Sequence, residues 1–296
     1  MSSRILSPQA LLWILTIFTF GSAASPLPNS TAFAQDKDAA EKAKKMEKIN
    51  VLGPEAAQEF SQGNYAKALS NAKEICKLQP DDVRFQSFLG EVSFASGDFA
   101  TCVTAYDNVI RLDAKSEPYL WQRGLALYYA DRFKEGVEQF ETHQTVNSND
   151  VENAVWHLLC AAQISDVAAA RKKLIPIVGD TRIPMSQVYE MFAGRMTPKE
   201  VLARAMKTSA RAREGGRGHK LQQYYAHLYI GLYHEMLGEK DAAMTALKKA
   251  KEINPLGKTN FMGQVARVHI DIREQQAKKD AEPDNKETVE EKAGKN

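Results

Sequence analysis

Histidine and cysteine are the side chains of this 296-residue chain that would carry metal or nucleophilic chemistry. The six histidines are scattered, and His227 and His234 lie two helical turns apart, where a shared metal ion needs one turn. His234-Glu235 lacks the second histidine of a zinc-protease helix, and the repeat spacing described below places His227 at a core position. With no Ser/His/Asp or Cys/His arrangement either, the sequence predicts no catalytic centre, no metal site and no cofactor, and hence a protein that is not an enzyme.

The three cysteines, Cys76, Cys102 and Cys160, fall on positions where the expected helices need small or medium apolar side chains. An odd number leaves at least one free thiol, which is notable in an exported protein. We interpret all three as buried packing residues, with a redox pair as the alternative.

The most basic segment is Gly215-Gly216-Arg217-Gly218, with Arg211, Arg213, His219 and Lys220 beside it. A phosphate-binding loop would need a preceding strand and a following Lys-Ser/Thr, and neither is present. A mobile helix connection with solvated arginines is the favoured interpretation, and an anion site is the alternative. The net charge of +2 predicts no nucleic-acid partner.

A period of thirty-four residues sets the positions of all these side chains. Gly63-Asn64-Tyr65 recurs as Gly97-Asp98-Phe99, the aromatic residue returns at Phe133, and Gly90 and Gly124 are separated by the same interval. Two helices that meet through a small residue fill each period, which is the tetratricopeptide (TPR) signature. Because such pairs bury their apolar faces by stacking, the sequence predicts an all-α superhelix with a concave side.

We predict about three regular repeats, of which the first is interrupted in its leading helix by Gly53 and Pro54. A decayed fourth repeat follows around Trp156. Thr197-Pro198-Lys199-Glu200 then predicts a capped helix running to about Arg213. A C-terminal repeat comes next, and a final amphipathic helix, Asn260 to Gln276, would cap the open end of the superhelix.

The inward positions of each repeat's first helix predict a groove for a protein or extended peptide, because aromatic side chains with polar groups anchor bound partners. The alternative is that irregular repeats bury several of these side chains. The predicted groove residues are Arg84, Phe88, Glu91, Phe94, Trp121, Gln122, Leu125, Tyr128, Tyr129, Tyr225, Tyr229 and Leu232.

The first residues have the layout of a secretory signal peptide. Arg4 precedes the apolar run Leu11 to Phe20, and small residues follow. We predict cleavage after Ala34, with Ala24 second, and a periplasmic or secreted product; an N-terminal membrane anchor is the alternative.

The predicted division of the chain follows from these patterns. Residues 1–34 form the signal peptide, and 35–50 a charged lead-in that is either a solvated helix or a linker. Residues 51–276 form the superhelical domain, and 277–296 a disordered charged tail.

Several segments resemble the bacterial envelope TPR lipoproteins of the NlpI family. They are the helix Arg123 to Arg132, the helix at Trp156-His157-Leu158, Tyr189 to Gly194 and Tyr229 to Tyr233, within a span from Asn64 to Ile272. The resemblance implies a homodimeric periplasmic adaptor that brings cell-wall hydrolases and an envelope protease together. The chain departs from that family in lacking the lipid-modified cysteine.

Residue pattern and resemblance together predict an exported scaffold that binds proteins or peptides, with no small-molecule substrate. A self-associating structural component of the envelope, without a dedicated peptide ligand, is the alternative.

Overall fold

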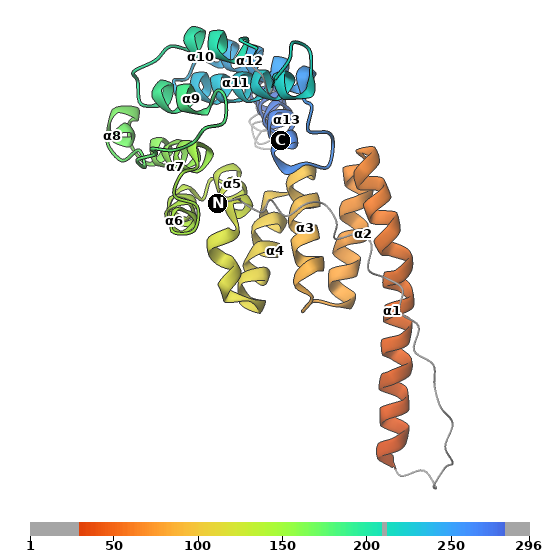
Figure 1. The fold of residues 1–296 in the computed structure, drawn as a ribbon. Coiled ribbons are helices and arrows are strands. Elements are labelled where there is room, and N and C mark those ends of the chain that lie inside the picture. Colours follow the sequence, from red (N-terminus) through yellow and green to blue (C-terminus); the bar gives the residue numbers. More distant parts are fainter. Residues whose placement is uncertain (1–29, 209–211, 282–296) are drawn as a thin grey trace, which may run out of the picture. The chain divides into compact units, whose positions relative to one another are not determined.

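The computed structural model describes residues 30–208 and 212–281, with the side chains of 30–36 excepted. The chain divides into two units, Met1–Lys44 and Lys45–Asn296, and the second unit contains the repeats. The described helices are α1 (Ser30–Gln62), α2 (Tyr65–Leu78), α3 (Val83–Ser96), α4 (Phe99–Leu112), η1 (Ala114–Tyr119), α5 (Trp121–Tyr129), α6 (Phe133–Gln144), α7 (Val151–Ile164), α8 (Val167–Arg171), α9 (Met185–Phe192), α10 (Pro198–Ala205), α11 (Arg217–Met236), α12 (Lys240–Ile253) and α13 (Phe261–Ala281) (Figure 1).

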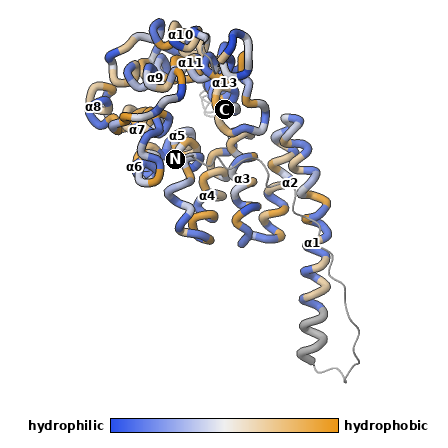
Figure 2. Tube along the Cα trace, viewed as in Figure 1, coloured by the Kyte–Doolittle hydropathy of each residue, from blue (hydrophilic) through white to orange (hydrophobic). Residues whose placement is uncertain are grey.

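The predicted all-α architecture of helix pairs is confirmed. The pairs α3/α4, α5/α6 and α11/α12 are helical hairpins, and Figure 2 shows polar and apolar residues interleaved along them. Helices that bury one face and solvate the other have this pattern.

A glycine in the first helix of each regular pair receives a large side chain from the second helix. A Cβ added at Gly90 would lie 2.7 Å from the Tyr106 ring, and one at Gly124 would lie 2.5 Å from the Phe140 ring. At Gly231 the added atom would lie 2.5 Å from the Leu247 side chain. The thirty-four-residue period therefore reflects a steric requirement of helix crossing, because any larger residue would push the two helices apart.

The turn inside each pair also explains a recurring residue. Gly63, Gly97 and Gly238 end the first helix of their pairs with φ of +88°, +76° and +77°. Glycine enters this left-handed region without the steric cost that a Cβ brings. Asp131 adopts φ +57° at the equivalent turn of the third repeat, where the sequence has no glycine.

The predicted interruption of the first repeat at Gly53 and Pro54 is wrong, because α1 continues through Pro54. Proline removes one helical hydrogen bond, to the residue four positions earlier. That residue, Asn50, is exposed, so water can satisfy its carbonyl, while Ile49 and Phe60 are buried on another face of the helix. Packing therefore outweighs the local propensity of the proline.

The capping box at Thr197 and Glu200 is present as predicted, but α10 ends at Ala205 instead of near Arg213. The buried His219 joins the residues just after α10 to the start of α11. Its Nδ1 accepts a hydrogen bond from the Gly215 amide (3.2 Å), and its Nε2 donates one to the Met206 carbonyl (3.1 Å). The basic segment is thus fastened at its histidine, while Arg217 and Lys220 are exposed.

Both predicted end segments extend beyond the described residues. Most of the predicted signal peptide, with the second cleavage position Ala24, falls in residues 1–29, and most of the predicted tail falls in 282–296, both outside the described part. The favoured cleavage position, after Ala34, falls within α1. Helix α1 begins at Ser30 and includes the charged lead-in, whose residues 37–48 are exposed. Helix α13 runs past Gln276 to Ala281. Within the described ranges, none of the helices combines the length and apolar character that crossing a membrane requires.

Candidate protein-binding surface

Helix α13 lies against the concave side of the N-terminal repeats, at the C-terminal end of α3 (Figure 1). The Phe261 ring stacks on Phe94, with centroids 4.1 Å apart and an interplanar angle of 28°. The Phe261 and Trp121 rings meet edge to face, with centroids 5.3 Å apart. The predicted capping helix therefore also covers part of the predicted groove.

Polar contacts hold α13 and the loop before it to the first two repeats. The Arg267 guanidinium lies over the Tyr65 ring, 4.4 Å from its centroid, and donates to the Ala95 carbonyl at 2.5 Å. Tyr65 in turn donates to the Lys258 carbonyl (3.2 Å), and Lys258 Nζ donates to the Gln62 carbonyl (2.9 Å). Residues nearly two hundred positions apart in sequence are thereby joined.

A buried histidine lies between α13 and its neighbours. His269 is fully buried, its Nδ1 is 3.1 Å from the Tyr129 hydroxyl, and its Nε2 is 3.6 Å from Glu235. Arg273 pairs with the same Glu235 at 2.5 Å. Burial lowers the pKa of His269 against the opposing effect of Glu235, so the imidazole is neutral at pH 7 and packs as a polar core residue.

Five of the twelve predicted groove residues are core residues in this conformation. Their exposed fractions lie between 0% and 3%, which leaves no surface for a partner. They are Phe94, Leu125, Tyr128, Tyr229 and Leu232. The repeat spacing predicts these side chains on the concave side, and in the structure they pack in the core instead.

Two further predicted residues, Tyr129 and Tyr225, are partly covered. Tyr129 stacks on Phe99 at 5.1 Å and contacts His269, so it belongs to the α13 interface. Tyr225 stacks on Tyr229 at 6.3 Å, away from the N-terminal repeats. The structure therefore does not unite the twelve residues into one groove.

The remaining five predicted residues keep access to solvent. Arg84 is exposed, and the other four are half-buried. We call this set, Arg84, Phe88, Glu91, Trp121 and Gln122, the open concave patch. Its two aromatic side chains are partly engaged already: Phe88 packs edge-on against Phe60, and Trp121 against Phe261.

Glu91 is the unusual member of the open concave patch. It forms no hydrogen bond or ion pair with any residue in the described ranges. Burial raises the pKa of Glu91 to about 6. Arg84, two helical turns earlier on α3, does not neutralise it, because that guanidinium pairs with Asp82 at 2.7 Å.

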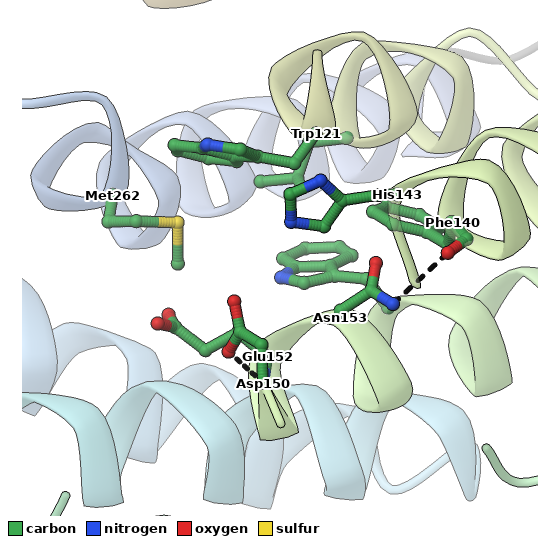
Figure 3. A pocket seen from close by; sticks show the side chains of 9 residues that line it. Trp121, Phe140, His143, Asp150, Glu152, Asn153 and Met262 are labelled. Carbon is green, nitrogen blue, oxygen red and sulfur yellow. Dashed lines mark hydrogen bonds between the residues drawn. The ribbon is translucent and has the colours of Figure 1, made fainter. Parts of the chain in front are cut away.

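A small cavity of about 50 Å³ lies behind Trp121 (Figure 3). Figure 3 shows Trp121 and His143 facing Asp150 and Glu152 across it, with Met262 of α13 at one side. A space of this size holds a few water molecules.

Sequence reasoning missed the polar cluster beside this cavity. Arg182 reaches Asp150 and Glu152 at 2.5 Å each and Asp180 at 2.6 Å, and Tyr229 donates to Glu152 at 2.9 Å. Asp150 was identifiable only as a helix cap, because the irregular fourth repeat gives no register for its partners. The cluster fixes the start of α7 against the loop before α9.

The three cysteines are free and buried, as their positions predict. Burial raises the pKa of Cys76 to about 11 and that of Cys102 and Cys160 further. Thiols in such surroundings are poor nucleophiles. Among the described residues, no group of three or more histidine, cysteine or acidic side chains is arranged to hold a metal ion.

The chain matches no family model. Among solved structures it is similar to a tetratricopeptide repeat protein from Parabacteroides merdae ATCC 43184, with 13% sequence identity and a TM-score of 0.46. That likeness covers 80% of this chain and 91% of the other. The assignment of helix pairs to a TPR-type architecture stands on their own geometry: the thirty-four-residue period, the glycine contacts and the turns described above.

Proposed function

We propose that this protein is an interaction scaffold that holds a segment of a partner protein on the open concave patch. The observation that carries the proposal is α13, which the same concave side already holds through an aromatic stack and an arginine on a backbone carbonyl. A surface that binds one helix in this way has the aromatic and polar groups to bind a segment of another protein.

Site-specific photocrosslinking in living cells tests the proposal. A benzophenone amino acid at Phe88 places the reactive group in the patch, and the same amino acid at Tyr119, which is 63% exposed on η1, is the control. We expect discrete crosslinked products from position 88, identified by mass spectrometry, and none of the same products from position 119. Identical products from both positions, or none from position 88, would exclude the patch as the binding surface.

Export belongs to the proposal as well, supported by the apolar run and small residues at the start of the sequence. N-terminal sequencing of the protein from its own cells should give Gln35 as the first residue. By resemblance to the envelope TPR lipoproteins, cell-wall hydrolases and an envelope protease are the partner classes to examine first among the crosslinked products.

The alternative, a self-associating structural component, is favoured by one observation: a segment of the chain itself fills part of the concave side. Light scattering of the purified chain separates the two proposals. A concentration-independent monomer or dimer that still forms heterologous crosslinks supports the scaffold, whereas growing assemblies without other partners support the structural role.

A further inference from the structure

Partial burial of the Glu91 carboxylate costs free energy, and no hydrogen bond or ion pair with the described residues offsets this cost. Other partly or largely buried carboxylates have cationic partners: Asp82 pairs with Arg84, Asp180 with Arg182, and Glu235 with Arg273. Glu91 is half-buried on α3 and has none among the described residues. A charge without a partner is retained in folded proteins mainly where it serves a site, because its removal would otherwise stabilise the fold.

Glu91 lies at the edge of the core between α3 and α4, where its charge adds to the effect of burial in raising the pKa of Cys102 and Tyr106, and its side chain is only half-buried. On α3 it lies one turn from Phe88 and one turn from Phe94 and Ala95, the residues that contact α13. Helix α13 therefore ends its contact with α3 next to Glu91 and does not pair with it. The carboxylate lies at the border between the covered and the open part of the concave side.

A second acceptor on the same patch also lacks a partner. The Oε1 atom of Gln122 is buried and accepts no hydrogen bond from the described residues. Gln122 lies thirty-four positions after Phe88, at the same place in the next repeat. Two acceptors of the patch therefore lack a donor among the described residues, and its one cation, Arg84, is held by Asp82.

We propose that Glu91 is the anchor for a basic side chain, lysine or arginine, of the partner segment bound on the open concave patch. The proposal deepens the scaffold function and rests on it. Ammonium and guanidinium groups donate hydrogen bonds and accept none, which complements a carboxylate and an amide oxygen. An acidic segment or a nucleic-acid backbone would meet a like charge at Glu91.

A contact of this kind already exists within the chain: Arg267 of α13 binds the concave side at Ala95, one helical turn from Glu91. Arg267 combines an aromatic ring, Tyr65, with a backbone acceptor, Ala95. The partner's basic residue would pair with the Glu91 carboxylate in a similar manner. The partner segment would therefore extend along α3 from the point where Phe261 of α13 stops.

A phage-displayed random peptide library, panned on the full chain, tests the anchor without a known ligand. Three proteins are compared: wild type, Glu91→Gln, and Glu138→Gln as a control with the same change at an exposed position of α6. We expect peptides enriched on wild type and on the control to share a lysine or arginine. The best peptide and its Lys/Arg→Gln twin are then measured by fluorescence anisotropy against all three proteins.

The expected result is a loss of affinity of about tenfold or more on Glu91→Gln, with the basic peptide only. The twin should bind all three proteins with equal, weaker affinity. Enriched peptides without basic residues, or equal binding to Glu91→Gln, would overturn the anchor while leaving the scaffold intact. Enrichment of no peptide on wild type would overturn both. Circular dichroism checks that the variant is folded.

Discussion

Replacing Glu91 by glutamine should stabilise the protein at neutral pH. Burial raises the pKa of Glu91 from the ordinary 4.5 to about 6, so the folded protein binds this proton more tightly than the unfolded chain. Below pH 4.5 the carboxyl is protonated in both states and costs nothing. As the pH rises through 6, the folded state must bear a half-buried charge, and the stability present at low pH is lost. The difference corresponds to about 2 kcal/mol.

Urea denaturation followed by far-UV circular dichroism measures this effect at several pH values. The free energy of unfolding of Glu91→Gln should exceed that of wild type by about 2 kcal/mol at pH 7.5. This difference corresponds to an increase of roughly 4–8 °C in Tm. The advantage should disappear near pH 4, where the protonated carboxyl resembles the amide. The control Glu138→Gln, at an exposed position, should stay within about 0.5 kcal/mol at every pH. A variant less stable than wild type at pH 7.5, or a difference independent of pH, would refute the reasoning.

Three further outcomes are expected. Gly124→Ala should lower the free energy of unfolding by about 1–3 kcal/mol, because its Cβ would lie 2.5 Å from an aromatic ring. Gly53→Ala has open space around it, so its free energy of unfolding should be unchanged or higher by up to about 1 kcal/mol. Equal effects of the two substitutions would contradict the steric argument. Arg267→Ala should cost about 1–3 kcal/mol and speed hydrogen exchange at the end of α3, and unchanged exchange there would show that α13 is held by its apolar contacts alone. The three buried thiols should react with Ellman's reagent only as fast as the native protein unfolds, so a stoichiometric fast phase would count against their burial.

The repeats were predictable from sequence because their determinants are local. Gly90 and Tyr106, or Gly124 and Phe140, lie sixteen positions apart and meet within one hairpin, so periodicity alone reveals their contact. The glycine turns are equally local, because a single φ decides the residue type. Pro54 shows the limit of that logic: an unfavourable local residue is overruled by the burial of Ile49 and Phe60.

The candidate surface was predictable only in part, for a geometric reason. Phase assigns Phe94 and Glu91 to the same side of α3, yet one is buried under Phe261 and the other is not. Which of the two is covered depends on where α13 arrives after the superhelix has curved through the intervening repeats. That position depends on the crossing angles of many successive helix pairs, and no local sequence motif determines these angles. The partners of Arg182 were unpredictable for the same reason.

The contact between α13 and the first repeats also changes how this chain should unfold. An open repeat array loses its end repeats first, because each unit depends only on its neighbours. Here Arg267 and Lys258 join the last helices to Tyr65 and Gln62, so neither end can fray without breaking the other's contacts. Unfolding should therefore be closer to a single cooperative transition. Folding should be slower than in an open array, because its final contacts close a loop of nearly two hundred residues.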